Sequence, residues 1–359
     1  MKSHLLLAIA SVLLLFTFCS DRSKQTMHAD AIQPKIITET TKHDTDDPAI
    51  WLHPTDRSKS LIIGTDKDVD GALYVFDLDG KVIEEKTVRN LKRPNNVDVE
   101  YGLMLNGVPT DIAVTTERMN NAIRVFSLPD MRAVDNGGIQ VFENQALRAP
   151  MGIALYKRPA DGAIYAIVGR KEGPTDGTYL LQYRLEDDGT GHVKGTKVRE
   201  FGLWSGAKEI EAIAVDDAPG YVYYSDERIG VRKYHADPDF GNNELALFGT
   251  EGFADDHEGI SIYPASDSTG YILVSDQQAN AFRIFKREGE PSDPHEHQLV
   301  KVVYVSCSES DGSEVTNAVL NATFPKGLFV AMSDNRTFHY YSWEDIAGND
   351  LVIAPDGIQ

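Results

Sequence analysis

Short apolar runs of β type alternate with polar turns along almost the whole chain, in six copies of one pattern. Each copy holds a β-rich run, a charged turn and a second β-rich run that ends in a polar hairpin. The paired runs cover residues 61–67 and 72–76, 111–118 and 122–126, 164–171 and 179–183, 221–227 and 230–234, 271–277 and 281–285, and 327–334 and 337–341. The period of roughly 50 residues is that of a four-stranded propeller blade.

A further short strand precedes each copy, and in several copies small residues follow its acidic or polar start. These strands are expected at residues 47–51, 96–100, 151–155, 211–215, 258–262 and 314–315. Small residues suit an inner strand that is crowded near an axis. The pattern predicts an all-β fold, a six-bladed β-propeller with four-stranded blades around a central channel. Residues 35–39 are expected to pair into the last blade and close the ring, which removes open sheet edges.

The charged turns after the second strands should lie on one rim, because equivalent positions of a propeller share a face. These turns carry Lys67, Arg118, Lys171, Glu227, Gln277 and Asp334. A solvated loop is the more common explanation of any single charged turn. Its recurrence at one phase of several blades instead favours a metal site beside an anion site.

Three aspartates, Asp44, Asp46 and Asp47, stand within four positions just before an apolar run. Like charges this close repel one another, so a fold that gathers them usually places a cation there. Oxygen-only ligands suit a hard cation such as Ca²⁺. A solvated acidic turn is the alternative interpretation of the cluster by itself.

The net charge of −20 over 359 residues limits the partners of the chain. Nucleic acid and anionic membrane surfaces are poor partners for so acidic a protein. A polyanionic substrate would also be repelled, unless bound cations reverse the local sign of the charge.

The N-terminus indicates export. Residues 5–18 are apolar, and this run suits a signal peptide better than a membrane span. Residues 15–19 resemble a bacterial lipoprotein box with Cys19 as the lipidated residue, although Phe18 stands where that pattern prefers a small residue. A plain signal peptide that is cut a little later is the alternative.

The expected organisation is a lipoprotein-type signal peptide at 1–19, a linker at 20–31 and one propeller domain at 32–359. The protein is expected in the cell envelope or secreted, with the membrane contacted only through an N-terminal lipid anchor.

Several segments match one known family in order along the chain, from about residue 36 to residue 346. They are residues 44–54, 93–99, 208–212, 225–227, 256–259, 275–277, 309–315 and 324–330. In these segments the chain resembles the β-propeller phytases, calcium-dependent phosphatases that act on myo-inositol hexakisphosphate (phytate). The resemblance implies hydrolysis of phosphate monoesters by a metal-activated water, without a phospho-enzyme.

The resemblance also implies roles for individual residues. Several Ca²⁺ ions would be held by Asp46, Asp47, Glu211, Glu227, Asp256, Glu258, Gln277, Glu309, Asp311 and Glu314. Catalytic roles are implied for Glu211, Glu227, Lys67 and Arg118, and substrate binding for Lys67, Arg118, Lys171 and Met151. The implied partner is calcium phytate or a related inositol phosphate, bound by a monomer.

Three departures from the family pattern fall at the second of its two phosphate sites. Met151 stands where the family often has a tyrosine, Asp68 where some members have a lysine, and the turn at residues 170–177 is longer. A smaller or different phosphate ester therefore remains open as the substrate. Two other functions remain open as well: a calcium-dependent lactonase-type propeller hydrolase, and a non-catalytic, surface-anchored binding propeller.

Overall fold

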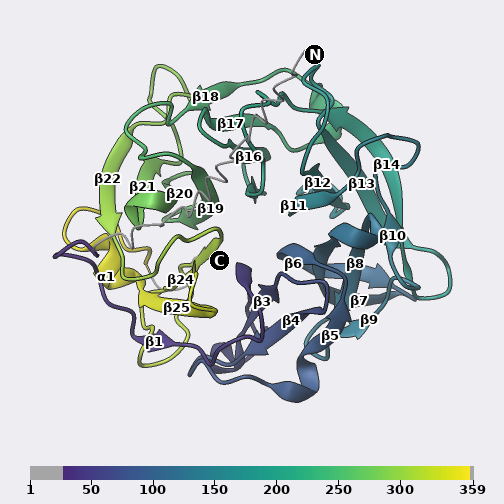
Figure 1. Cartoon of the computed structure of the whole chain (residues 1–359), viewed down its shortest axis with the longest axis horizontal. Helices are drawn as coiled ribbons and strands as arrows, with labels where there is room; N and C mark the ends of the chain where they lie inside the picture. Colours follow the sequence, from purple (N-terminus) through teal and green to yellow (C-terminus); the bar gives the residue numbers. More distant parts are fainter. Residues whose placement is uncertain (1–26, 356–359) are drawn as a thin grey trace, which may run out of the picture.

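Six antiparallel sheets are arranged in a ring in this computed structural model, which describes residues 27–355 (Figure 1). From the inner to the outer strand, the first three blades are β2 (Thr45–Trp51), β3 (Leu61–Asp66), β4 (Gly71–Phe76) and β5 (Val88–Leu91); β6 (Pro94–Leu105), β7 (Val108–Glu117), β8 (Ala122–Ser127) and β10 (Ile139–Gln140); and β11 (Pro150–Lys157), β12 (Ile164–Arg170), β13 (Leu180–Asp187) and β14 (Val193–Phe201). A short strand, β9 (Arg132–Ala133), also pairs with β8.

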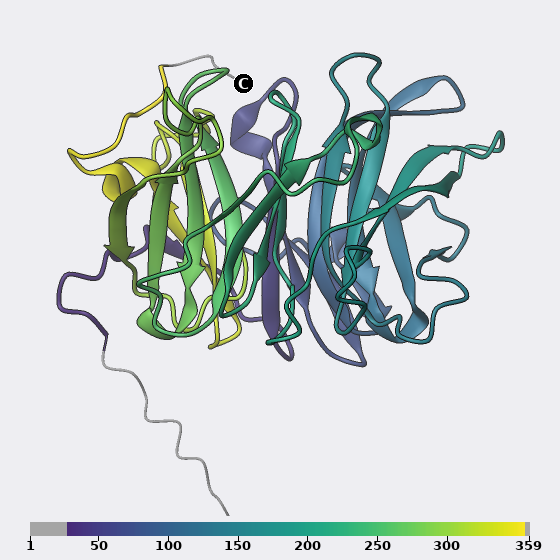
Figure 2. The same ribbon diagram turned by 90° about the horizontal axis from the view of Figure 1, so that it is seen from above.

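The last three blades follow the same order. They are β15 (Ile213–Asp216), β16 (Tyr221–Asp226), β17 (Gly230–His235) and β18 (Ala246–Phe248); β19 (His257–Pro264), β20 (Gly270–Asp276), β21 (Ala281–Lys286) and β22 (Leu299–Tyr304); and β23 (Ser313–Thr316), β24 (Leu328–Ser333), β25 (Thr337–Ser342) and β1 (Ile36–Ile37). The predicted six-bladed propeller is confirmed. Figure 2 shows the ring edge-on, with strands spanning its thickness and loops gathered at its two ends.

The first strand of the described chain closes the ring. In β1, Ile36 pairs with Tyr340 and Ile37 pairs with His339, both in β25. The last blade thus takes its outer strand from the N-terminal end of the propeller, as the sequence predicted. This pairing completes the last blade, so the outer edge of β25 is covered rather than open.

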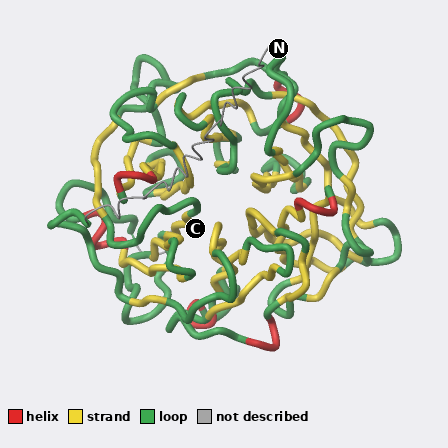
Figure 3. Tube along the Cα trace, in the orientation of Figure 1, coloured by secondary structure: helices red, strands yellow, loops and turns green. Residues whose placement is uncertain are grey.

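Helical segments are short and lie between the strands (Figure 3). They are α1 (Trp343–Ala347) and the 3₁₀ turns η1 (Arg57–Lys59), η2 (Glu84–Lys86), η3 (Arg118–Asn120), η4 (Pro238–Phe240) and η5 (Gln277–Ala279). Across residues 27–355, no helix has the length and apolar character needed to cross a membrane.

The core lies between neighbouring blades rather than within one sheet. Ile112 of the second blade and Val168 of the third belong to one apolar cluster, and both are fully buried. The rings of Phe282 and Phe329 meet edge to face across the fifth and sixth blades, with their centroids 4.8 Å apart. Burial of each such side chain stabilises the folded state by roughly 1.5–3 kcal/mol relative to leaving it exposed. Because neighbouring blades cover both faces of each blade, the sequences of its strands are apolar runs.

Glycine allows the inner strands to approach one another near the axis. A Cβ atom at Gly152 would collide with the backbone oxygen of Glu211, and one at Gly312 would collide with Asp46 and Asp47. These two positions hold Glu211 and the two aspartates close to the axis. The packing of the channel therefore helps to position the carboxylates of the candidate site.

Candidate metal and phosphate site

Three carboxylates from three different blades meet at one end of the channel. Asp46 lies in β2, Glu211 lies two residues before β15, and Asp311 lies two residues before β23. One oxygen of each lies within 4.8 Å of the others, and we call this group the first triad. The start of an inner strand occupies an equivalent place in every blade, so residues far apart in sequence converge here.

Two cations and one amide hold the first triad together. The Lys67 ammonium pairs with Asp46 Oδ1 and lies 3.8 Å from Asp311 Oδ2. Arg118 Nη2 lies 3.6 Å from Glu211 Oε1. The Asn95 amide donates to Asp46 Oδ2 at 2.8 Å and to Glu211 Oε1 at 3.3 Å, and its oxygen accepts a hydrogen bond from Arg118.

The electrostatics of the first triad favour uptake of a cation. Burial raises the pKa of Asp46 to about 7, although Lys67 acts in the opposite direction. Burial also raises the pKa of Asp311 well above its usual range, with the charge of Asp46 adding to the effect. Further positive charge at this point would stabilise the ionised carboxylates.

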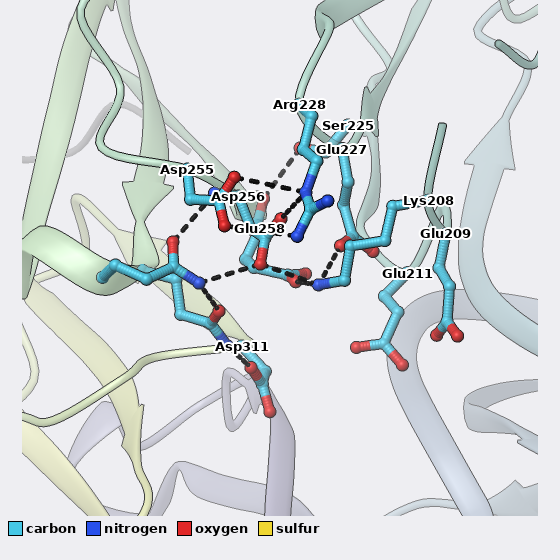
Figure 4. Close-up of polar contacts among 12 residues, drawn as sticks. Lys208, Glu209, Glu211, Ser225, Glu227, Arg228, Asp255, Asp256, Glu258 and Asp311 are labelled. Carbon is cyan, nitrogen blue, oxygen red and sulfur yellow. Dashed lines mark hydrogen bonds and ion pairs between the residues drawn. The ribbon is translucent and has the colours of Figure 1, made fainter. Parts of the chain in front are cut away.

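A second triad lies beside the first and consists of Glu227, Asp256 and Glu258 (Figure 4). Glu227 follows β16, Asp256 precedes β19, and Glu258 lies within β19. The Lys208 ammonium pairs with Glu227 Oε2 and lies 2.8 Å from Asp256 Oδ2 and 3.7 Å from Glu258 Oε1. Arg228 Nε approaches from outside the triad, 3.1 Å from Asp256 Oδ1.

The pKa values of the three members of the second triad shift in different directions, although burial disfavours the charged form of each. Burial raises the pKa of Glu227 to about 7 and that of Glu258 well above its usual range. Burial also opposes ionisation of Asp256, but hydrogen bonds from Lys208 and Arg228 outweigh it and lower the pKa of Asp256. Of the three carboxyl groups, Asp256 is therefore the one whose surroundings favour the ionised form.

Two glutamines connect the triads. The Gln277 amide donates to Asp311 Oδ1, and its oxygen accepts a hydrogen bond of 2.6 Å from the Gln278 amide. Gln278 also donates to Asp256 Oδ2 at 2.8 Å. The two groups of carboxylates are thus parts of one polar network at a single end of the channel.

The donor set of this network fits a hard divalent cation. All six triad ligands are carboxylates, which suit Ca²⁺. Glu258 Oε2 is buried and accepts no hydrogen bond from any residue within 27–355. A buried acceptor without a donor is costly, so this atom is better placed as a metal ligand than as a structural group.

A third acidic group lies deeper in the channel. Asp47, Asp98 and Glu314 line a cavity of about 110 Å³ between the inner strands. Burial raises the pKa of Asp98 to about 7 and that of Glu314 to about 8. Asp47 Oδ2 accepts a hydrogen bond of 3.0 Å from the Val97 backbone. Asp47 and Glu314 therefore belong to the channel rather than to either triad.

The remaining expected residues occupy different places. Lys171 lies on the rim, half exposed, with its ammonium 2.5 Å from Glu209 Oε1. The backbone N–H of Glu309 donates to Asn280 Oδ1 at 2.8 Å, and within the described chain Glu309 belongs to neither triad.

Met151 requires a correction. Its side chain is completely buried in β11, so the thioether presents no surface to a substrate. Seven of the eight residues of β11 are buried, because neighbouring blades cover both faces of this inner strand. The structure therefore does not place Met151 in a phosphate pocket.

Sequence reasoning missed several residues of the site. Asn95 and Asp98 lie inside the segment 93–99 that carried the family resemblance, and this was the available signal. Lys208 starts another matched segment, but nothing in the sequence indicates that its ammonium lies among three carboxylates. Arg228 and Gln278 each directly follow an expected residue, Glu227 and Gln277.

Comparison with known proteins places the chain in a family. It matches the family described as Phytase over residues 2–351. It is 32% identical over 329 residues to the 3-phytase of Bacillus subtilis (strain 168), covering 87% of this chain and 82% of the relative. Among solved structures, a chain of "Crystal structure of Nidogen/Laminin Complex" aligns with a TM-score of 0.41 and 11% identity, covering 79% of this chain and 93% of that chain. From the family match and the identity to the Bacillus enzyme together, the chain belongs to the phytase family.

Proposed function

We propose that this phytase, a phosphoric monoester hydrolase, releases phosphate from phytate with the help of Ca²⁺ ions held by the two triads. The observation that carries the calcium assignment is the meeting of two all-carboxylate triads at one channel end. The unpaired oxygen of Glu258 supports it. The lactonase and binding-protein alternatives are less well supported, because the matched family and the Bacillus relative are both phytases.

Bound metal ions would neutralise phosphate oxygens and lower the pKa of an attacking water. The side chains of this site would hold and orient the reacting groups. Glu211 and Glu227 would contribute ligand oxygens, one from each triad. Lys67 and Arg118 lie beside the first triad and place positive charge where a phosphate would approach.

A second phosphate of the substrate would be bound further out on the rim. Lys171 is half exposed there and pairs with Glu209, two residues before Glu211 of the first triad. We expect one phosphate group of a polyphosphate to contact Lys171 while a neighbouring phosphate group faces Arg118. The net charge of −20 makes these cations important, because the protein as a whole repels an anionic substrate.

The direct test is phosphate release from calcium phytate, before and after exhaustive chelation. We expect activity with Ca²⁺, loss of it in chelator and recovery when Ca²⁺ is added back. Full activity after chelation would refute the calcium assignment. Phytate binding without phosphate release would instead favour the binding-protein alternative, and hydrolysis of a sugar lactone would favour the lactonase.

The location of the enzyme is a separate proposal. We propose that the chain is exported, anchored through a lipid on Cys19, and active as a monomer. Cys19 and the apolar run before it lie outside the described residues, so the support comes from the sequence pattern alone. Mass spectrometry of the N-terminal peptide checks the lipid, with Cys19→Ala as the control, and light scattering checks the monomer.

A further inference from the structure

Lys208 occupies an unusual position for a lysine near an expected metal site. Its ammonium lies within 3.7 Å of oxygens from all three members of the second triad. Figure 4 shows the side chain reaching toward these carboxylates from the segment before β15. A divalent cation that used the same three carboxylates would need this space, and two cations cannot share it at contact distance.

The surroundings of Lys208 allow the ammonium to leave. Its side chain is 34% exposed, whereas Glu227, Asp256 and Glu258 are 5% exposed or less. The backbone is held in place, because Trp204 Nε1 donates to the Lys208 carbonyl at 2.9 Å. The four-carbon stem is flexible. The ammonium can therefore move toward solvent while the carboxylates stay where they are.

We propose that Lys208 is a tethered counter-ion of the second triad, which holds the three carboxylates together in the metal-free protein and must be displaced when a divalent cation binds. The inference rests on the proposed function, because it assumes that this triad binds a metal ion. It assigns Lys208 a positioning role: the residue competes with the metal and so weakens its binding.

Arg228 provides a matched comparison. Like Lys208 it carries one positive charge near the second triad, and it pairs with Asp256. It approaches from outside, its other partner is Asp255, and its side chain is 49% exposed. Loss of Arg228 removes a nearby charge without vacating the space between the carboxylates. Comparison of the two variants therefore distinguishes displacement of the Lys208 ammonium by the metal from a general electrostatic effect on metal affinity.

The test is calorimetric titration of CaCl₂ into chelator-treated wild type, Lys208→Met and Arg228→Met. We expect Lys208→Met to tighten one class of calcium sites by roughly tenfold, because the competing charge is gone. Arg228→Met should raise the calcium affinity of the same sites by no more than about threefold, because a surface charge is screened by solvent and salt. Lys208→Gln, which keeps a polar side chain, should behave like Lys208→Met.

A second measurement is the melting temperature in chelator. Lys208→Met should melt below the wild type without calcium and gain more from calcium than the wild type does. The proposal fails if Lys208→Met binds calcium with unchanged or weaker affinity, or if Arg228→Met tightens binding equally. If the wild type binds no calcium at all, the proposed function fails together with this inference. If the wild type binds calcium but Lys208→Met does not bind it more tightly, this inference fails and the proposed function stands.

Discussion

The two triads have the same chemistry but differ in how their counter-ions are held. In the first triad, Lys67 and Arg118 are 12% and 10% exposed. In the second, Lys208 is 34% exposed and Arg228 is 49% exposed. The first triad is therefore paired within the packed end of the channel, whereas the second is paired by side chains that reach in from the rim.

This difference has an energetic consequence. Removal of one partner from a buried ion pair leaves a desolvated charge, which is strongly destabilising. A half-exposed pair is screened by water and contributes much less. We therefore regard the cations of the first triad as part of its architecture, and Lys208 as a replaceable occupant of the second.

The largest expected effect concerns turnover and tests whether both triads serve the reaction. Glu211→Gln and Glu227→Gln should each lower kcat by around two orders of magnitude, because the amide keeps the size but loses the charge that holds a metal. Steady-state phosphate release at saturating Ca²⁺ measures this. Glu209→Gln, beside the first triad but outside it, should act mainly on KM. Near wild-type turnover in Glu227→Gln would confine catalysis to the first triad.

A smaller effect concerns stability and tests the contrast between the counter-ions. In chelator, Lys67→Met should lower the free energy of unfolding by about 3 kcal/mol, because Asp46 is left buried without its partner. Lys208→Met should lower it by only about 1 kcal/mol, because water screens the partly exposed ammonium and Asp256 keeps its ion pair with Arg228. Urea unfolding of the two variants gives both values. Equal losses would show that exposure does not distinguish the two pairs.

The smallest effect concerns pH. The folded-state pKa values of Asp46 and Glu227 are raised to about 7 and that of Glu314 to about 8, all above their unfolded values. The folded protein then binds these protons more tightly, so their stabilising contribution is present below about pH 4 and is lost as the pH rises toward 8. In chelator, the melting temperature should fall between pH 5 and pH 8.

The variant Glu314→Gln measures how much Glu314 alone contributes to this pH dependence. In chelator at pH 8 the variant should melt above the wild type, and the gap should narrow at pH 5, where Glu314 is protonated in the folded protein. Calorimetric scans at the two pH values measure the gap. A gap of the same size at both would assign the effect to packing rather than to ionisation.

The repeated strand pattern was sufficient to predict the propeller, because each blade reads as an independent unit of apolar runs and polar turns. It also placed Lys67, Arg118 and Lys171 correctly, each directly after the second strand of its blade. These positions depend only on local strand ends. The need to cover a sheet edge predicted that residues 35–39 pair into the last blade, and the structure shows this as the pair of Ile36 with Tyr340.

The strand pattern could not predict which side chains of neighbouring blades contact one another. Lys208 meets Glu258 only because the fourth and fifth blades pack at a particular rotation, which the strand pattern does not encode. The same holds for the division of the acidic residues between two triads and a deeper channel group. Met151 was misplaced because the pattern gives the inner strand but not the cover on both of its faces.

The most direct test of the central claim, that both triads bind calcium, is the anomalous scattering of calcium in crystals grown with CaCl₂. We predict a peak at each triad, about 2.3–2.6 Å from carboxylate oxygens. We also predict that the Lys208 ammonium will have moved out from between Glu227, Asp256 and Glu258. Calcium peaks only at other places, or a Lys208 ammonium that still lies between the three carboxylates of the second triad beside a bound calcium, would contradict this account.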